Sequence, residues 1–270
     1  MLSTTSQRLI YFLAALYGIL GVALFILPEQ LAPVFAWKVS PFITMTMGGW
    51  CLGNAWLAFL AARRWRWELV YTPLVYLALF GVLESVIVLA FSDKLQLGHP
   101  IAWLYLLTLV VNVVAVIVGL IEWRRVRPAL PSGAAPLSKV LKGFVVVFVV
   151  IVAFLGSYGL LARIGDPGTN AQIFPEVMSL FTLKSFGAFY LSLALSVLPL
   201  FWARDRRSVL SHGFLNYGFL IFITLAGLAY LRLFNFSAHP FQGLYLGAYF
   251  VVAAVTTVFL LRGGTGTRAT

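Results

Sequence analysis

The sequence predicts an all-α membrane protein that crosses the bilayer eight times. First, 61% of its 270 residues are hydrophobic and only 10% are charged, whereas soluble domains are about 45–50% apolar and about 25% charged. Second, apolar segments of about 20 residues recur along the chain, and each is long enough to cross roughly 30 Å of hydrocarbon. Third, most charged residues lie in the short stretches between these segments. This composition excludes a water-soluble globular protein, a disordered chain and a disulfide scaffold.

Each apolar segment is expected to be a helix, because a spanning helix satisfies its own backbone hydrogen bonds in lipid. The expected spans are residues 9–27, 42–62, 69–91, 100–121, 142–162, 181–203, 212–234 and 241–261. The first span follows Arg8 and could be mistaken for a signal peptide. Its apolar run of about 19 residues exceeds the usual length of about 7–15 residues, so we interpret it as a retained helix.

Basic residues divide unevenly between the two sets of loops. Fourteen of the 19 fall on one side, namely Arg8, Arg63, Arg64, Arg66, Arg124, Arg125, Arg127, Lys139, Lys142, Arg204, Arg206, Arg207, Arg262 and Arg268. The other five are Lys38, Lys94, Arg163, Lys184 and Arg232. Because basic residues in short loops stay on the cytoplasmic side, the pattern predicts a multi-pass protein of the cell membrane with both termini in the cytoplasm. It also accounts for the net charge of +11 without a nucleic-acid partner.

A four-helix pattern occurs twice in the chain. Tyr17-Gly18-Ile19-Leu20 matches Tyr158-Gly159-Leu160-Leu161, and His99-Pro100 matches His239-Pro240. At a constant offset of 139, further matches pair Ser40, Phe42, Gly48, Leu52 and Ala55 with Ser179, Phe181, Gly187, Leu191 and Ala194. We therefore expect a duplicated unit.

Three regions follow from this duplication. Residues 1–121 form the first four-helix repeat, residues 122–141 a cytoplasmic linker containing Pro and Gly, and residues 142–270 the second repeat with a short tail. Because four is an even number of crossings, both repeats face the same way. The predicted arrangement is two parallel repeats related by a pseudo-twofold axis along the membrane normal.

Four polar residues are candidates for a site within the membrane: Glu84, Asn112, Thr108 and Lys184. An ionisable group at this depth is costly and is a functional-site hypothesis by default. One hypothesis pairs Glu84 with Lys184 across the two repeats. The alternative is a protonated Glu84 that joins helices through Thr108 or Asn112.

Four residues of the opposite, external face are further candidates: His99, His239, Glu29 and Glu176. The two histidines occupy matching positions before a proline, where they could be paired ligands or residues that begin a helix. The two glutamates follow prolines and could form a vestibule for cations or belong to ordinary turns. We interpret His212, at the start of the seventh span, as an interfacial residue.

Two glycine pairs have the spacing that permits close approach of helices. They are Gly49 with Gly53 and Gly243 with Gly247. We expect both to serve packing within the chain, with dimerisation as the alternative. The single cysteine, Cys51, permits no disulfide within the chain.

No nucleotide-binding, hydrolase or metalloprotease motif is present in the sequence. It therefore predicts no catalytic residue and no metal ligand, and it identifies no cofactor. The leading hypothesis is a non-enzymatic accessory subunit or a binder of an apolar ligand, with the lipid bilayer, another membrane protein or an apolar small molecule as partner. The second is a small-solute transporter or channel with a path between the repeats. The third is an intramembrane lipid-modifying enzyme that uses Glu84 and an external-face histidine.

Overall fold

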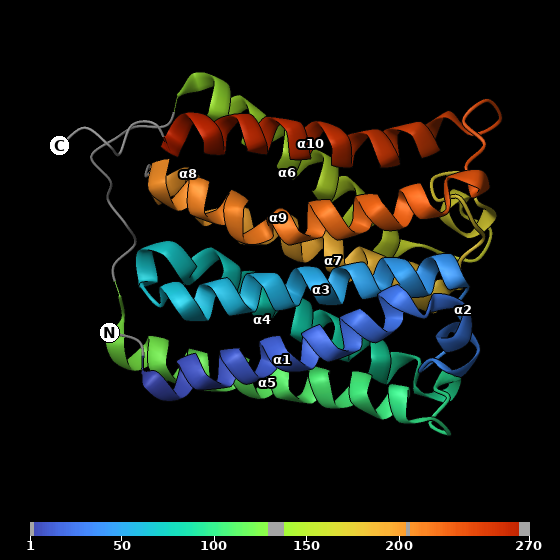
Figure 1. The fold of residues 1–270 in the computed structure, drawn as a ribbon, viewed down its shortest axis with the longest axis horizontal. Helices are drawn as coiled ribbons and strands as arrows, with labels where there is room; N and C mark the ends of the chain where they lie inside the picture. The colour runs from blue at the N-terminus through green and yellow to red at the C-terminus, as the bar shows by residue number, and fades with distance from the viewer. Residues whose placement is uncertain (1–2, 129–137, 204–205, 265–270) are drawn as a thin grey trace.

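A computed structural model of the protein describes residues 3–128, 138–203 and 206–264. Every regular element within these residues is a helix, and the long ones lie side by side along the longest axis of the molecule (Figure 1). The long helices are α1 (Thr4–Ile26), α3 (Pro41–Arg64), α4 (Trp67–Ala90), α5 (Pro100–Val126), α6 (Lys139–Leu161), α7 (Leu180–Val197), α9 (Arg206–Ala229) and α10 (Pro240–Gly264). The short ones are α2 (Pro28–Leu31), α8 (Pro199–Ala203), η1 (Ala32–Val34), η2 (Ser92–Lys94), η3 (Pro167–Asn170) and η4 (Leu231–Leu233).

Seven of the described helices are long and apolar enough to cross a membrane. The chain is therefore an all-helical, multi-pass membrane protein by composition and length. The remaining long helix is α3, which has 24 residues and buries Thr44, Thr46 and Asn54 among its neighbours. These polar residues lower the mean hydropathy of α3. The helix can hold them because they face neighbouring helices rather than lipid. A membrane crossing by α3, and hence the count of eight, remains a prediction.

Serine side chains cap several of the long helices at their first turn. Ser40 accepts a hydrogen bond from the backbone N–H of Ile43 at 3.2 Å, and Ser179 accepts one from Thr182 at the same distance. Such a cap satisfies a backbone donor that has no partner within the helix. Ser3 does the same for α1, which begins at Thr4 rather than at the expected residue 9. Polar residues before an apolar run thus extend the first helix.

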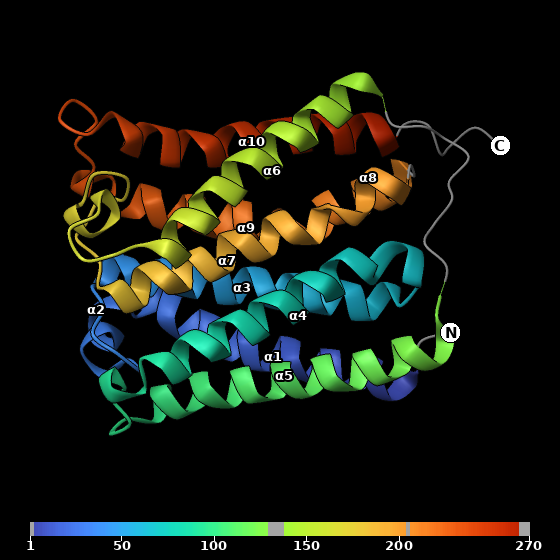
Figure 2. The same ribbon diagram turned by 180° about the vertical axis from the view of Figure 1, so that it is seen from behind.

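The long helices form two layers. Figure 1 shows α10, α9, α3 and α1 in the nearer layer, and Figure 2 shows α6, α7, α4 and α5 from behind. At the middle, α3 packs along α9, and α4 packs along α7 and α9. These four helices join the N-terminal half (α1–α5) to the C-terminal half (α6–α10).

The outer helices of the two halves pack differently. In the N-terminal half, α1 packs against both α3 and α5, and α4 closes the ring by contacting α3 and α5. In the C-terminal half, α6 packs on α7 and α10 packs on α9, but α6 and α10 make few close backbone contacts. Figure 2 shows α6 crossing α10 at an angle. The C-terminal half is therefore less tightly closed.

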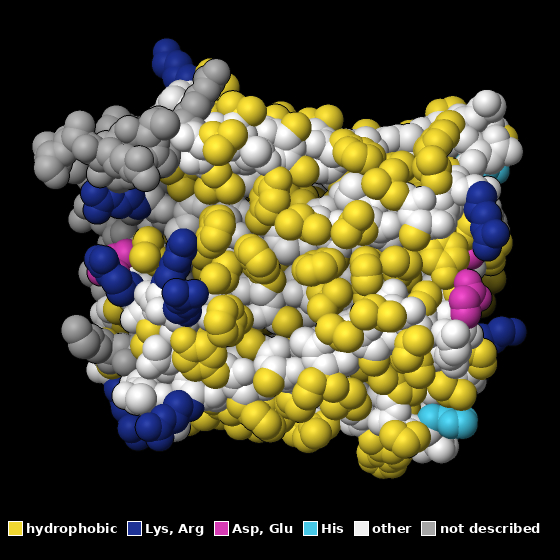
Figure 3. Space-filling view, viewed as in Figure 1, with side chains coloured by type: hydrophobic (Ala, Val, Ile, Leu, Met, Phe, Trp, Pro, Cys, Tyr) yellow, Lys and Arg dark blue, Asp and Glu magenta, His cyan; other side chains and the backbone are white. Residues whose placement is uncertain are grey.

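Charged side chains concentrate at the two ends of the bundle, and the long sides are largely hydrophobic (Figure 3). Most Lys and Arg side chains in this view lie at the end where α1 begins and α10 ends. The basic clusters of the sequence thus share one end of the molecule. Arg204, Arg268 and residues 129–137 of the linker expected at 122–141 lie outside the described residues.

Candidate functional site

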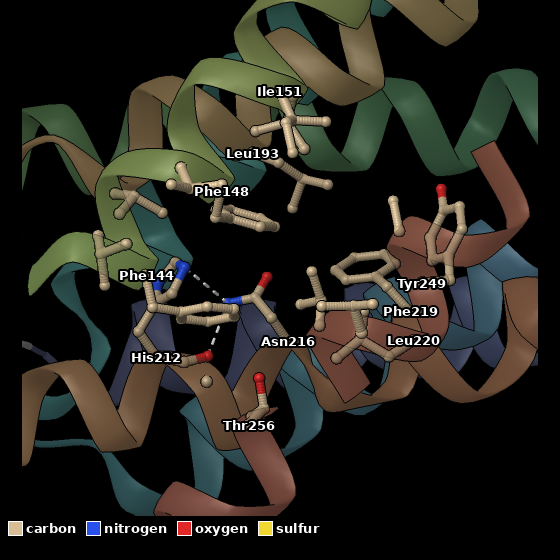
Figure 4. A pocket seen from close by; sticks show the side chains of 18 of the residues that line it. Phe144, Phe148, Ile151, Leu193, His212, Asn216, Phe219, Leu220, Tyr249 and Thr256 are labelled. Carbon is tan, nitrogen blue, oxygen red and sulfur yellow. Dashed lines mark hydrogen bonds between the residues drawn. The ribbon is translucent and has the colours of Figure 1, made fainter. Parts of the chain in front are cut away.

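A cavity of about 220 Å³ lies in the C-terminal half, between α6, α7, α9 and α10. Figure 4 shows Phe144, Phe148 and Ile151 of α6 on one side and His212 and Asn216 of α9 on another. The lining also includes Val147 of α6 and Val251 of α10, whose exposed fractions are 57% and 59%. The cavity therefore reaches the outer surface of the bundle, where lipid chains would lie.

Small side chains on α10 and glycines on α6 create this space. Ala248, Val252 and Thr256 line the cavity at intervals of four residues, so they share one face of α10. Near its C-terminal end, α6 approaches α7 closely at Gly156 and Gly159. A Cβ atom at Gly159 would lie 2.7 Å from the Cα atom of Gly187. Because α6 is held to α7 at that end and crosses α10 at an angle, a gap is left between the two outer helices.

Polar groups of the cavity wall are bonded mainly to other protein groups. His212 Nδ1 lies 2.9 Å from Thr72 Oγ1 of α4, and Asn216 Nδ2 donates to the His212 carbonyl at 2.8 Å. Tyr190 and Tyr249 share a hydrogen bond of 2.7 Å between their hydroxyl groups. The surface left for a ligand is therefore almost entirely apolar.

The environment of His212 differs from the interfacial position expected from the sequence. Its exposed fraction is 8%, and it contacts α4 across the two halves. The neighbouring Ser211 donates to the Leu69 carbonyl at 3.1 Å. The position of His212 near the start of a helix could not reveal its burial, because its contact with Thr72 depends on how α9 packs against α4.

Glu84 is buried in the N-terminal half, with 1% of its surface exposed. Its Oε1 atom accepts a hydrogen bond of 2.6 Å from the Tyr105 hydroxyl. The partners expected for it are bonded elsewhere, because Thr108 donates to the Leu104 carbonyl and Asn112 donates to the Tyr17 hydroxyl at 2.8 Å. The expectation of a direct bond to either residue is wrong, and no sequence pattern indicated Tyr105 as the partner of Glu84.

Lys184 does not pair with Glu84. Its Nζ atom donates to the Leu160 carbonyl at 2.6 Å, in the last turn of α6. Carbonyl groups at a helix C-terminus have no partner within the helix, and a cation there is favoured. The proposed Glu84–Lys184 ion pair is therefore corrected to a cap that Lys184 supplies to α6.

The four candidates of the opposite end do not form one cluster. His99 is exposed at the N-cap of α5, and His239 precedes Pro240 at the start of α10. Glu29 accepts a hydrogen bond of 3.0 Å from the Tyr230 hydroxyl. Glu176 accepts one from the Ser40 hydroxyl.

Both glutamates join the two halves of the chain at this end. Partial burial raises the pKa of Glu176, because a charged carboxylate loses hydration there. Burial and the nearby Glu29 carboxylate raise the pKa of Tyr230 to about 12. Hydrogen bonds between loops thus account for both acids without a bound cation.

The seam between the two halves is filled by aromatic rings. Trp50 stacks on Phe189 with a centroid separation of 4.6 Å, and Tyr76 contacts Phe219 edge-on at 5.3 Å. Gly49 brings α3 close to α9, since a Cβ atom there would lie 3.2 Å from the Phe222 carbonyl carbon. The first glycine pair therefore serves packing within the chain, as expected.

The second glycine pair has a different environment. A Cβ atom at Gly247 would meet no heavy atom within 4 Å, and at Gly243 the nearest would be a Phe236 ring carbon at 3.7 Å. The expectation that Gly243 and Gly247 bring helices together within the chain is therefore wrong. This face of α10 is open because α6 does not pack against it.

No group of three or more His, Cys, Asp or Glu side chains in the described residues is arranged to hold a metal ion. In comparisons with known proteins, no family model, no curated protein and no solved structure matches the chain. The function must therefore be argued from the site itself.

Proposed function

We propose that this protein is a non-enzymatic membrane protein that binds one hydrocarbon chain of a lipid-like molecule between α6 and α10. The observation that carries the proposal is the cavity of about 220 Å³ with an apolar lining that extends to exposed Val147 and Val251. Ligand pockets are typically apolar with a few placed polar groups. Here Asn216 provides such a group at one side of the cavity, because its buried Oδ1 atom has no hydrogen-bond partner.

Comparison of the two halves supports a specialised cavity. By the sequence offset of 140, Thr108 and Asn112 of α5 correspond to Ala248 and Val252 of α10. In the N-terminal half, Asn112 reaches the Tyr17 hydroxyl of α1 and ties α5 to α1. The corresponding tie is lost in the C-terminal half, because valine has no hydrogen-bonding group and Tyr158 instead accepts from the Gly168 backbone at 2.6 Å. An evolved exchange of polar for small apolar residues would produce such an opening.

The alternative functions fit the structure less well. A transport path between the repeats would run through the seam that Trp50 and Phe189 fill by stacking. An enzyme using Glu84 would need substrate access to a carboxyl with 1% of its surface exposed. His99 lies on the exposed end of α5, away from that buried group. Binding a hydrocarbon chain between α6 and α10 requires neither a path through this seam nor access to Glu84.

We also propose that the two halves are parallel four-helix repeats, divided at residues 122–141, with both termini in the cytoplasm. If α3 corresponds to α7 and α4 to α9, a twofold axis exchanges the α3–α9 contact with the α4–α7 contact, and both contacts are present. Glycines lie at corresponding helix crossings, Gly48 between α1 and α3 and Gly187 between α6 and α7. Both patterns support a duplicated unit.

Single cysteines test the orientation. In a Cys51→Ser background, Gly98→Cys should react with an impermeant thiol reagent added outside intact cells, and Lys139→Cys should react only after the membrane is opened. Both positions are exposed, and a Cβ atom at Gly98 meets no heavy atom within 4 Å. The reverse labelling pattern would contradict cytoplasmic termini.

The ligand itself is identified by native mass spectrometry of protein purified in a mild detergent. We expect a bound molecule of defined mass that carries at least one long hydrocarbon chain and is released by denaturation. The comparison sample is bulk lipid from the same membrane. Recovery of lipid species only in their bulk proportions would contradict selective binding.

A further inference from the structure

A second, much smaller cavity lies in the N-terminal half, among α1, α3, α4 and α5. Its volume is about 10 Å³, and its polar wall is formed by Tyr17, Trp50, Glu84, Tyr105 and Thr108. These residues are buried, with exposed fractions of 5% or less. The proposed hydrocarbon site in the C-terminal half involves none of them.

Two atoms of this wall lack a hydrogen-bond partner in the protein. They are Oε2 of Glu84 and Nε1 of Trp50, both buried; the Ser185 hydroxyl, which also lacks a hydrogen-bond partner, lies near the Glu84 carboxyl. A buried polar group without a partner costs about 1–3 kcal/mol, so two such groups beside one cavity indicate a bound hydrogen-bonding molecule. Since a water oxygen can accept one hydrogen bond from a protonated carboxyl and another from an indole N–H, one molecule could satisfy both.

The size and chemistry of the cavity specify that molecule. A site must offer about 10–15 Å³ and two to four polar partners to hold a water, and this cavity is of that size. A metal cation is disfavoured, because the indole N–H only donates hydrogen bonds. The wall also offers acceptors for the hydrogens of a water. Thr108 gives its own hydrogen to the Leu104 carbonyl, and Tyr17 accepts only one bond, from Asn112.

We propose that this cavity binds a single water molecule that links uncharged Glu84 to Trp50. The Glu84 carboxyl donates its Oε2 hydrogen to the water, and Trp50 donates from Nε1. The water donates in turn to Thr108 Oγ1 and Tyr17. Glu84 is uncharged because an isolated buried carboxylate is very costly, and neither ion pair found among the described residues involves it.

This water has a structural consequence for the N-terminal half. It connects α1, α3, α4 and α5 through Tyr17, Trp50, Glu84 and Thr108, one residue from each helix. Buried waters with about three hydrogen bonds are costly to remove. The hydrated site therefore holds this half closed, whereas the corresponding helices of the C-terminal half remain open.

Infrared difference spectroscopy of the full-length protein tests the proposal. We expect a carbonyl stretch of a protonated carboxylic acid that disappears in Glu84→Gln. In Trp50→Phe the band should shift, because the water loses one donor. Trp56→Phe is the matched control, since Trp56 is 36% exposed and donates to the Phe214 carbonyl instead. Its spectrum should keep the band unchanged.

Two results would overturn the proposal. The first is a spectrum without a protonated carboxyl band that depends on Glu84, or a band that Trp50→Phe leaves unmoved. The second concerns the unmodified protein, so it holds even if Glu84→Gln fails to fold. A density map that resolves ordered waters should show one peak within hydrogen-bonding distance of Glu84 Oε2 and Trp50 Nε1. No peak, or a peak with the coordination of a cation, would contradict a bound water.

Discussion

Replacing Gly48 by alanine is expected to destabilise the protein by about 1–3 kcal/mol, the usual cost of overpacking a close-packed interior. The new Cβ atom would lie 2.6 Å from the Phe25 backbone nitrogen and 2.9 Å from the Leu24 carbonyl carbon. Backbone atoms cannot rotate away as a flexible side chain can, so α1 and α3 must separate. Thermal melting in detergent measures the effect.

Gly247→Ala is the matched control for this substitution. Gly247 also lies within a long helix, but a Cβ atom there meets nothing within 4 Å. Because alanine favours the helix over glycine by about 1 kcal/mol, this variant should melt at the same temperature as the unmodified protein or slightly above it. Equal melting temperatures for Gly48→Ala and the unmodified protein would show that α1 and α3 do not pack as described.

Filling the larger cavity should abolish ligand binding while the fold is kept. Ala248→Phe places a ring in the space lined by α6, α9 and α10, where only a methyl group now stands. We expect the amount of co-purified ligand to fall at least tenfold. Because a ligand stabilises the folded state by about 2.7 kcal/mol at a hundredfold excess over its dissociation constant, removing lipid should lower the melting temperature of the unmodified protein and leave that of the variant nearly unchanged.

Ala254→Phe separates cavity filling from the general effect of a larger side chain. Ala254 lies on the exposed face of the same helix, outside the cavity lining. Its phenylalanine should face lipid and leave ligand recovery unaltered. Loss of ligand in both variants, or in neither, would argue against the site between α6 and α10.

The helical class could be predicted from sequence because lipid imposes strict requirements on the backbone. A run such as 100–121 must be a helix of about that length, and α5 indeed extends from Pro100 to Val126. The ends of the helices are harder to predict, since they depend on capping residues such as Ser3 rather than on hydropathy. Hydropathy was also least informative for α3, whose polar residues face neighbouring helices.

The contacts of the candidate residues could not be predicted, because they depend on helix rotation and tilt. The sequence marks Lys184 and Glu84 as costly in lipid, but it does not indicate their partners, which are the Leu160 carbonyl for Lys184 and Tyr105 for Glu84. The cavity gave no sequence signal of its own. Ala248, Val252 and Thr256 are ordinary residues of an apolar helix, and only the crossing of α6 over α10 leaves them unpacked.

A density map of the protein extracted from its native membrane tests the central claim most directly. We predict continuous, elongated density between α6 and α10, in contact with Phe148 and Val252 and ending near His212 and Asn216. The small apolar residues of α10 should remain apart from α6. An empty map with α10 moved onto α6, so that Ala248 and Val252 pack against Phe148, would contradict a hydrocarbon-binding function.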